Sequence, residues 1–139
     1  MAESVMTHII KHNHLQDHFE IASAATSREE IGNPVHYGTV RKLQEMNIPV
    51  IPHKAVQMTR ADYSYYDYIV GMDGNNIRGI DRIIGEDPQG KVYKLLAFAG
   101  EGRDVADPWY TGDFDATYRD VLAGCEGLLA YIKAHPKVE

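Results

Sequence analysis

The run Tyr68-Ile69-Val70-Gly71-Met72, which Asp73 follows directly, decides the fold class of this chain. An uncharged apolar run of this kind is typical of a strand that is buried on both faces. Asp is a favoured residue at the start of a helix, and Ile77, Ile80 and Ile84 then supply an apolar face at helical spacing. We therefore predict a buried strand that leads straight into a helix, the basic unit of an α/β protein.

The rest of the chain extends the same pattern. Phe19 to Ala24 and Val92 to Phe98 are predicted strands, and Thr59 to Asp62 has the spacing of a capping box that opens a brief helix. Longer helices are predicted over residues 2–12, after Gly32-Asn33-Pro34 through Val40, Leu43 and Met46, and along a C-terminal apolar face. That face consists of Phe114, Tyr118, Val121, Leu122, Cys125, Leu128, Leu129 and Ile132. Alternating helices and strands predict an α/β fold of three layers with a mostly parallel sheet.

Composition limits the functional classes. With 139 residues, of which 44% are hydrophobic, the chain has the size of one globular domain, residues 1–139. A net charge of −6 without a run of Lys or Arg argues against a nucleic-acid partner. No apolar stretch approaches the length of a membrane span, so no membrane partner is expected. The single cysteine permits no internal disulfide, and without a signal-peptide pattern we expect a cytoplasmic protein.

Four blocks of sequence stand out by their order and spacing. They are Ser23-Ala24-Ala25-Thr26-Ser27 with Glu30-Ile31-Gly32-Asn33-Pro34; His53-Lys54-Ala55-Val56-Gln57 with Thr59-Arg60-Ala61-Asp62-Tyr63; Met72-Asp73 with Asn76 and Arg78; and Asp107-Pro108-Trp109-Tyr110-Thr111-Gly112. Together they span essentially the whole chain, and in this order they resemble the low-molecular-weight protein tyrosine phosphatases. The resemblance implies that residues 1–139 form a single phosphatase-like domain.

The resemblance also implies hydrolysis of phosphotyrosine proteins or small aryl phosphates. In that family a cysteine thiolate attacks the phosphorus while an arginine holds the phosphate oxygens. Asp107 resembles the general acid, which protonates the departing phenolic oxygen and then, as a base, activates water. Trp109 and Tyr110 resemble the aromatic wall of the substrate site, and His53 resembles a histidine that braces the phosphate-binding loop. No metal or other cofactor is expected.

A further implication is that this chain lacks its nucleophile. The family's phosphate loop has the form Cys, five residues, Arg, and the opening Met1-Ala2-Glu3-Ser4 resembles the residues that follow it. We therefore expect an N-terminally truncated, inactive domain without the first strand, the nucleophilic cysteine or the arginine. The missing strand belongs between Phe19–Ala24 and Tyr68–Met72. Either these two segments pair directly, or another chain, such as a second copy in a homo-oligomer, completes the sheet.

Residues that could replace the nucleophile or hold a metal have simpler interpretations. Cys125, the one cysteine, lies on the apolar face of the C-terminal helix, so we expect it in the core. Burial raises the pKa of a thiol and makes it a poor nucleophile. His8 and His12 have the i, i+4 spacing of two ligands on one helix, but no Cys or Glu completes a site. A solvated helix face is favoured, and no metal site is predicted.

Two hypotheses on function stay open at the level of the sequence. In the first, the natural protein is a low-molecular-weight protein tyrosine phosphatase, and a loop of the form Cys, five residues, Arg precedes Met1. In the second, the chain is a non-catalytic binding or assembly module that keeps the aromatic residues Trp109 and Tyr110. The coding DNA upstream of Met1 separates the two, because only the first requires the loop to be encoded there in frame.

Overall fold

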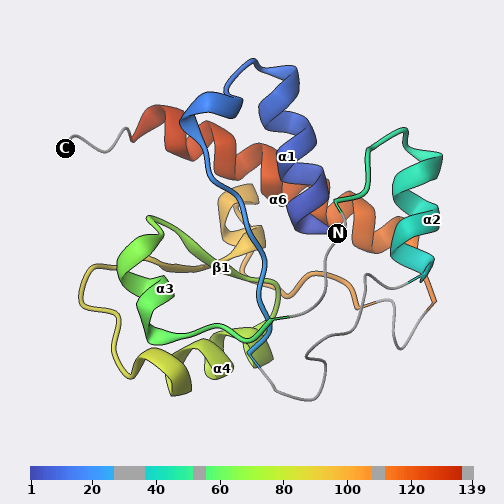
Figure 1. Ribbon diagram of the computed structural model, residues 1–139. Coiled ribbons are helices and arrows are strands. Elements are labelled where there is room, and N and C mark those ends of the chain that lie inside the picture. Colours follow the sequence, from blue (N-terminus) through green and yellow to red (C-terminus); the bar gives the residue numbers. More distant parts are fainter. Residues whose placement is uncertain (27–36, 52–55, 108–111, 136–139) are drawn as a thin grey trace.

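Strands lie in the middle of the molecule, with helices on both sides. The computed structural model describes residues 1–26, 37–51, 56–107 and 112–135. Figure 1 shows α1, α2 and α6 on one side of β1 and α3 and α4 on the other, so the predicted three-layer α/β architecture is confirmed. The elements are α1 (Ala2–His12), the 3₁₀ helix η1 (Gln16–His18), α2 (Tyr37–Glu45), α3 (Arg60–Tyr65), β1 (Ile69–Gly71), α4 (Gly74–Ile84), β2 (Val92–Lys94), the 3₁₀ helix η2 (Leu95–Ala99) and α6 (Phe114–Ala134).

The buried run Tyr68–Met72 contains β1 and directs its side chains to two separate cores. β1 pairs in parallel with β2. Ile69 packs with Ile80 and Ile84 of α4, whereas Val70 packs against the larger core, which α1 and α6 help to form. Because successive side chains of a strand point to opposite faces, one short strand joins both helical layers. The predicted strand, its parallel pairing and the helix that follows it are confirmed.

The predicted strand Val92–Phe98 is correct only in its first half. β2 ends at Lys94, and Leu95–Ala99 forms η2 instead. Leu95 and Leu96 are 1% and 0% exposed, and both belong to the larger core. In a strand these two neighbours would point to opposite faces, so a tight helical turn is needed to bury both in one core. The apolar run predicted burial correctly but could not distinguish a strand from a buried turn.

The predicted strand Phe19–Ala24 is wrong. The segment has no regular secondary structure, and the ladder contact that follows it is an isolated parallel bridge between Ala25 and Gln57. Phe19 and Ile21 still pack against the larger core, which explains the apolar pattern. A strand also needs a neighbouring strand with which to form its backbone hydrogen bonds, and the described residues place no strand beside this segment.

Direct pairing of Phe19–Ala24 with Tyr68–Met72, one of the two predicted ways to close the sheet, is also wrong. β1 faces β2 through Ile69, whose N–H donates to the carbonyl of Lys91 at 2.9 Å. Because backbone N–H groups alternate in direction along a strand, the N–H of Val70 points to the opposite edge. The described residues place no strand at that edge. Completion of the sheet by another chain stays a prediction.

Local hydrogen bonds set the helix starts that the sequence predicts. The Asp73 carboxylate accepts from the N–H of Asn76 at 2.7 Å and so caps α4. The Asp62 carboxylate accepts from the N–H of Thr59 at 2.9 Å, a capping-box contact at the start of α3. The bounds of α1 and α6 match the helices predicted from their apolar faces. Predictions that depend on contacts within one or two turns of the chain are confirmed.

α6, the longest of the described helices, forms the centre of the larger core. It packs against α1, α2 and η2. Two glycines allow its close approach to η2. A Cβ atom on Gly127 would lie 2.6 Å from the carbonyl carbon of Phe98, and one on Gly124 would lie closer than 3.0 Å to Leu95. The contact between α6 and η2 therefore leaves no room for a side chain at these two positions.

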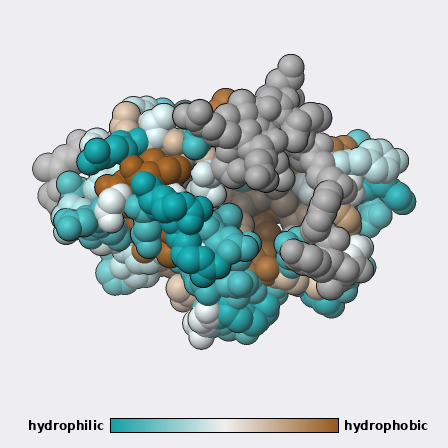
Figure 2. Space-filling model, turned by 90° about the horizontal axis from the view of Figure 1, so that it is seen from below, coloured by the Kyte–Doolittle hydropathy of each residue, from teal (hydrophilic) through white to brown (hydrophobic). Residues whose placement is uncertain are grey.

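The described residues on the side of α4 form a mostly hydrophilic surface. Figure 2 views the molecule from that side and shows apolar side chains only in limited areas between hydrophilic ones. The exposed face of α4 contributes Asn75, Arg78, Asp81 and Arg82. Among the described residues, no helix combines the length and the hydropathy that crossing a membrane requires.

We expect Gly127→Ala to lower the free energy of unfolding by about 1–2 kcal/mol. The new methyl group must displace the backbone of Phe98, at a cost that exceeds the gain of about 1 kcal/mol in helix propensity. Gly102→Ala is the matched control, because a Cβ at Gly102 meets nothing within 4 Å. Denaturant unfolding measures both. Equal stability of the two variants would contradict the close approach of α6 and η2.

Candidate active site

Asp107, the predicted general acid, is exposed at the end of an irregular segment between η2 and α6. Two residues earlier, Val105 is 8% exposed, and its N–H donates to the carbonyl of Met72 at 2.9 Å. Met72 directly follows β1, so this hydrogen bond attaches the segment to the carboxyl end of that strand. Open α/β sheets bind their ligands outside the carboxyl ends of the strands. Asp107 therefore lies close in sequence to a point where a catalytic acid is expected.

His53, Trp109 and Tyr110 lie outside the described residues. His53 was predicted to brace the phosphate-binding loop, and Trp109 and Tyr110 were predicted to line the substrate site. Their roles stay predictions, and the geometry of the site is given by Asp107 and the segment that leads to it.

Two side chains of α6 hold the residue before Asp107. The N–H of Ala106 donates to Oδ2 of Asp120 at 2.9 Å, and the Thr117 hydroxyl donates to the carbonyl oxygen of Ala106 at 2.7 Å. Thr117 is 8% exposed, and the Asp120 side chain is 12% exposed. Thr117 and Asp120 lie three residues apart and therefore on one helix face. Both backbone polar groups of Ala106 are bound to that face.

Arg103 binds the same carboxylate from the other side. Its two terminal nitrogens lie 2.8 and 2.9 Å from the two Asp120 oxygens, a bidentate ion pair. The hydrogen bond from Arg103 lowers the pKa of Asp120 below its usual range. Glu101 also accepts from Arg103, at 3.2 Å from Nε. Asp120 is therefore an ionised acceptor with its partners already in place.

Asp104 attaches the same segment to α4 and β2. Its carboxylate accepts from the N–H of Gly74, the first residue of α4, at 3.1 Å. It also lies 2.7 Å from Nζ of Lys94 in β2, and the hydrogen bond from Lys94 lowers the pKa of Asp104. The Lys94 ammonium donates in addition to the carbonyl of Gly102 at 3.1 Å. Residues 102–106 are thus bound to β1, β2, α4 and α6 before the chain reaches Asp107.

The sequence does not point to Thr117, Asp120 or Arg103. The i, i+3 spacing of Thr117 and Asp120 indicates only that they share a helix face. Their common partner is the backbone of Ala106, and every residue except proline carries the same N–H and C=O groups. A pattern of side chains could therefore not reveal this contact, and only the packing of the loop on α6 creates it.

Cys125 is part of the core, as predicted. The residue is 1% exposed, and its Sγ lies 3.9 Å from the carbonyl oxygen of Ala2 in α1. Burial raises the pKa of the Cys125 thiol from 9.0 to about 12. The thiol is therefore protonated near neutral pH and shielded from solvent. The one cysteine among these 139 residues is not placed to attack a substrate.

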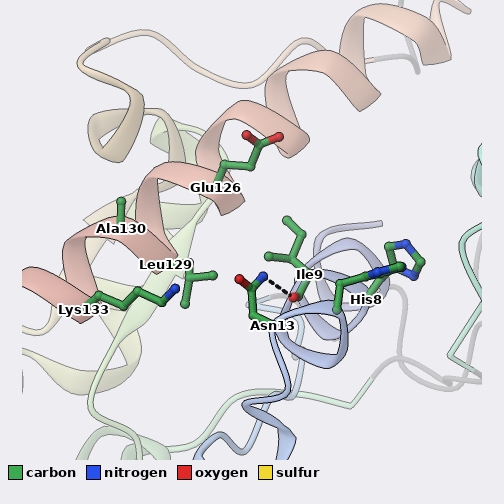
Figure 3. Close-up of a pocket in the computed structure, with 8 residues that line it drawn as sticks. His8, Ile9, Asn13, Glu126, Leu129, Ala130 and Lys133 are labelled. Atoms are coloured by element: carbon green, nitrogen blue, oxygen red, sulfur yellow. Dashed lines mark hydrogen bonds between the residues drawn. The ribbon is translucent and has the colours of Figure 1, made fainter.

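A groove of about 500 Å³ lies between the C-terminal halves of α1 and α6. In Figure 3, Leu129 of α6 points toward α1, and Asn13 donates to the carbonyl of Ile9 at 2.8 Å. Its rim includes Glu126 and Lys133. The nearest of these residues, Glu126, lies six residues along α6 from Asp120, more than one and a half turns, so the groove is separate from the Asp107 segment.

His8 and His12 also line this groove. Their ring centroids lie 4.3 Å apart in an edge-on arrangement, and His12 is exposed. Partial burial and the neighbouring His12 lower the pKa of His8. Within the part of the chain that the structure describes, no group of three or more His, Cys, Asp or Glu side chains could hold a metal ion.

Comparison with known proteins identifies the family. The sequence pattern of the low molecular weight phosphotyrosine protein phosphatases matches residues 1–138, and the chain belongs to this family. A curated relative, the low molecular weight protein-tyrosine-phosphatase PtpA of Staphylococcus aureus, is 36% identical over 133 residues, which cover 95% of this chain and 84% of the relative.

Solved structures agree with this assignment. YfkJ from Bacillus subtilis superimposes on this chain with a TM-score of 0.91 at 30% identity. The superposition covers 98% of this chain and 87% of the YfkJ chain. The low molecular weight protein tyrosine phosphatase SP-PTP from Streptococcus pyogenes gives a TM-score of 0.81 at 34% identity, with coverage of 98% and 83%. The predicted family and fold class are therefore confirmed.

We expect the Cys125 thiol to resist a disulfide reagent in the folded protein at pH 8 and to react at once in denaturant. Because its folded pKa lies above the unfolded value, the protonated thiol stabilises the fold fully below about pH 9, and this contribution is lost as the pH rises toward 12. Thiol absorbance and unfolding measured between pH 8 and 12 test this, with Cys125→Ala as the thiol-free blank. Stoichiometric labelling of the folded chain at pH 8 would contradict the burial of Cys125.

Proposed function

We propose that this domain carries the general acid and the substrate rim of a low-molecular-weight protein tyrosine phosphatase, and that these 139 residues alone do not turn over substrate. Each half is supported by one observation. The segment that ends at Asp107 is bound at each step to the surrounding elements, whereas the single thiol, Cys125, is buried on the inner face of α6.

In the proposed reaction Asp107 acts twice. As a thiolate attacks the phosphorus, the bond from phosphorus to the phenolic oxygen breaks, and Asp107 gives its proton to that oxygen. The resulting Asp107 carboxylate then takes a proton from the water that attacks the cysteinyl phosphate. This second step releases inorganic phosphate and regenerates the thiolate. Proton transfer at both steps needs no metal ion or other cofactor.

The remaining predicted residues have supporting roles. Trp109 and Tyr110 offer faces on which the phenyl ring of a phosphotyrosine side chain or a small aryl phosphate can stack. His53 braces the phosphate-binding loop in this proposal. The name of the Staphylococcus aureus relative supports phosphotyrosine proteins as substrates. We place this reaction in the cytoplasm, where a thiolate nucleophile is kept reduced.

The nucleophile and the phosphate-binding arginine have to come from outside residues 1–139. We propose that they precede Met1, in a strand followed by a loop of the form Cys, five residues, Arg. The direction of the Val70 N–H supports this. It points to the edge of β1 opposite β2, where a further strand could form backbone hydrogen bonds. Phe19 and Ile21, which pack against the same core as Val70, would flank it on the other side.

We expect the 139-residue chain to show no hydrolysis of p-nitrophenyl phosphate above a blank without protein. A fusion that places a family strand and a Cys, five residues, Arg loop before Met1 should gain vanadate-sensitive turnover. In that fusion, Asp107→Asn should lower kcat for phenyl phosphate, whose leaving group needs a proton, by roughly 10²–10⁴-fold, the usual contribution of a positioned general acid.

Asp115→Asn is the matched control in the fusion, because Asp115 is an exposed carboxylate of α6 that pairs with Lys42 of α2. Turnover by the unfused chain that vanadate blocks would contradict the proposed inactivity. A folded fusion without turnover would favour a non-catalytic binding or assembly module instead.

A further inference from the structure

The peptide unit that joins Ala106 to Asp107 is held from α6. A peptide unit is planar, so the carbonyl of Ala106 and the N–H of Asp107 move as one rigid group. The Thr117 hydroxyl donates to that carbonyl at 2.7 Å, and Asp120 accepts from the preceding N–H at 2.9 Å. With both bonds in place, the backbone has little freedom left to shift the Cα atom of Asp107.

Charge and burial make these two bonds stronger than ordinary surface contacts. The Asp120 side chain is 12% exposed, and its bidentate pair with Arg103 keeps it ionised. Hydrogen bonds to an ionised acceptor are stronger than those between neutral groups. Thr117 is 8% exposed, and its hydroxyl lies nearer to the carbonyl oxygen of Ala106, at 2.7 Å, than to that of Asp113, at 3.3 Å, so the bond to Ala106 is the shorter of its two contacts.

The segment of residues 102–106 would be attached to the rest of the fold even without Thr117 and Asp120. Val105 is already bound to Met72, and Asp104 to Gly74 and Lys94. The contacts of Thr117 and Asp120 add the last restraint, directly before Asp107. A general acid works only within hydrogen-bond reach of the leaving oxygen, and a misplacement of about 1 Å can cost 10²-fold in rate.

We propose that Asp120 and Thr117 are positioning residues for catalysis: they fix the two peptide units on either side of Ala106 and so hold the general acid at the leaving oxygen. This inference rests on the proposed function, because the position of Asp107 matters for turnover only if it transfers a proton. Arg103 supports Asp120 by orienting its carboxylate. None of the three touches the substrate in this proposal.

Hydrogen exchange measured by NMR on the 139-residue chain tests the backbone restraint without catalysis. In Asp120→Ala the amide of Ala106 should exchange about tenfold faster or more, because its charged acceptor is gone. The amide of Val105, bound to Met72, should keep its protection. Asp115→Asn, a change on the same helix away from this loop, should alter neither amide. An unchanged exchange rate at Ala106 in Asp120→Ala would overturn the restraint.

Leaving-group dependence in the active fusion tests the catalytic part. A dinitrophenol of low pKa leaves without a proton, whereas phenol needs one. Because kcat/KM reports only the steps up to release of the phenol, it depends strongly on the proton from Asp107 for phenyl phosphate and weakly for dinitrophenyl phosphate. Asp120→Ala and Thr117→Val should lower kcat/KM for phenyl phosphate by about tenfold or more, and that for dinitrophenyl phosphate by less than about twofold. Thr117→Ser, which keeps the hydroxyl, should restore most of the loss.

The outcomes separate this inference from the proposed function. An unsubstituted fusion that folds but is inactive overturns the proposed function, and the catalytic part of the inference with it, while hydrogen exchange still decides the restraint. If the fusion is active but Asp120→Ala and Thr117→Val lower kcat/KM equally for phenyl phosphate and dinitrophenyl phosphate, the positioning role is overturned. Asp120 and Thr117 then have only a structural role. Selective loss with phenyl phosphate, absent in Asp115→Asn, supports positioning of Asp107.

Discussion

The close packing of α6 on η2 is the constraint on which the rest of this structure depends. Gly124 and Gly127 bring the helix against Leu95 and the backbone of Phe98, where any side chain would collide. α1 and α2 then pack on the same helix, which completes the larger core. Because this core also receives Val70 of β1, the position of α6 fixes the strand relative to one whole helical layer.

The same helix serves the core and the candidate site with different stretches. Its middle and C-terminal part is apolar and includes Cys125, whose thiol is buried as a small hydrophobic group. Its first turns carry Thr117 and Asp120, which bind the backbone of Ala106. Rigid attachment of α6 to the core therefore also holds the segment before Asp107. The packing of α6 in the core thus both buries the protonated thiol of Cys125 and holds the segment that leads to Asp107.

The predictions from sequence succeeded or failed according to the range of the contacts involved. Asp73 and Asp62 each bind an N–H group three residues away, so their capping roles followed from spacing alone. The strand predicted at Phe19–Ala24 was wrong, because a strand exists only where a second segment offers hydrogen bonds. Likewise, the run after Lys94 was recognised as buried, but its conformation depended on how α6 covers Leu95 and Leu96.

The sequence by itself determined α1 and α6, the capped starts of α3 and α4, the buried run that forms β1, the place of Cys125 in the core and the family, through Asp107 and the blocks that precede it. These features depend on contacts between residues that are close in sequence, or on which side chains stand at particular positions. The tertiary structure alone decided which segments pair as strands and which side chains hold Ala106. Both depend on backbone N–H and C=O groups that nearly every residue shares, so their partners are chosen by packing and not by the order of side chains.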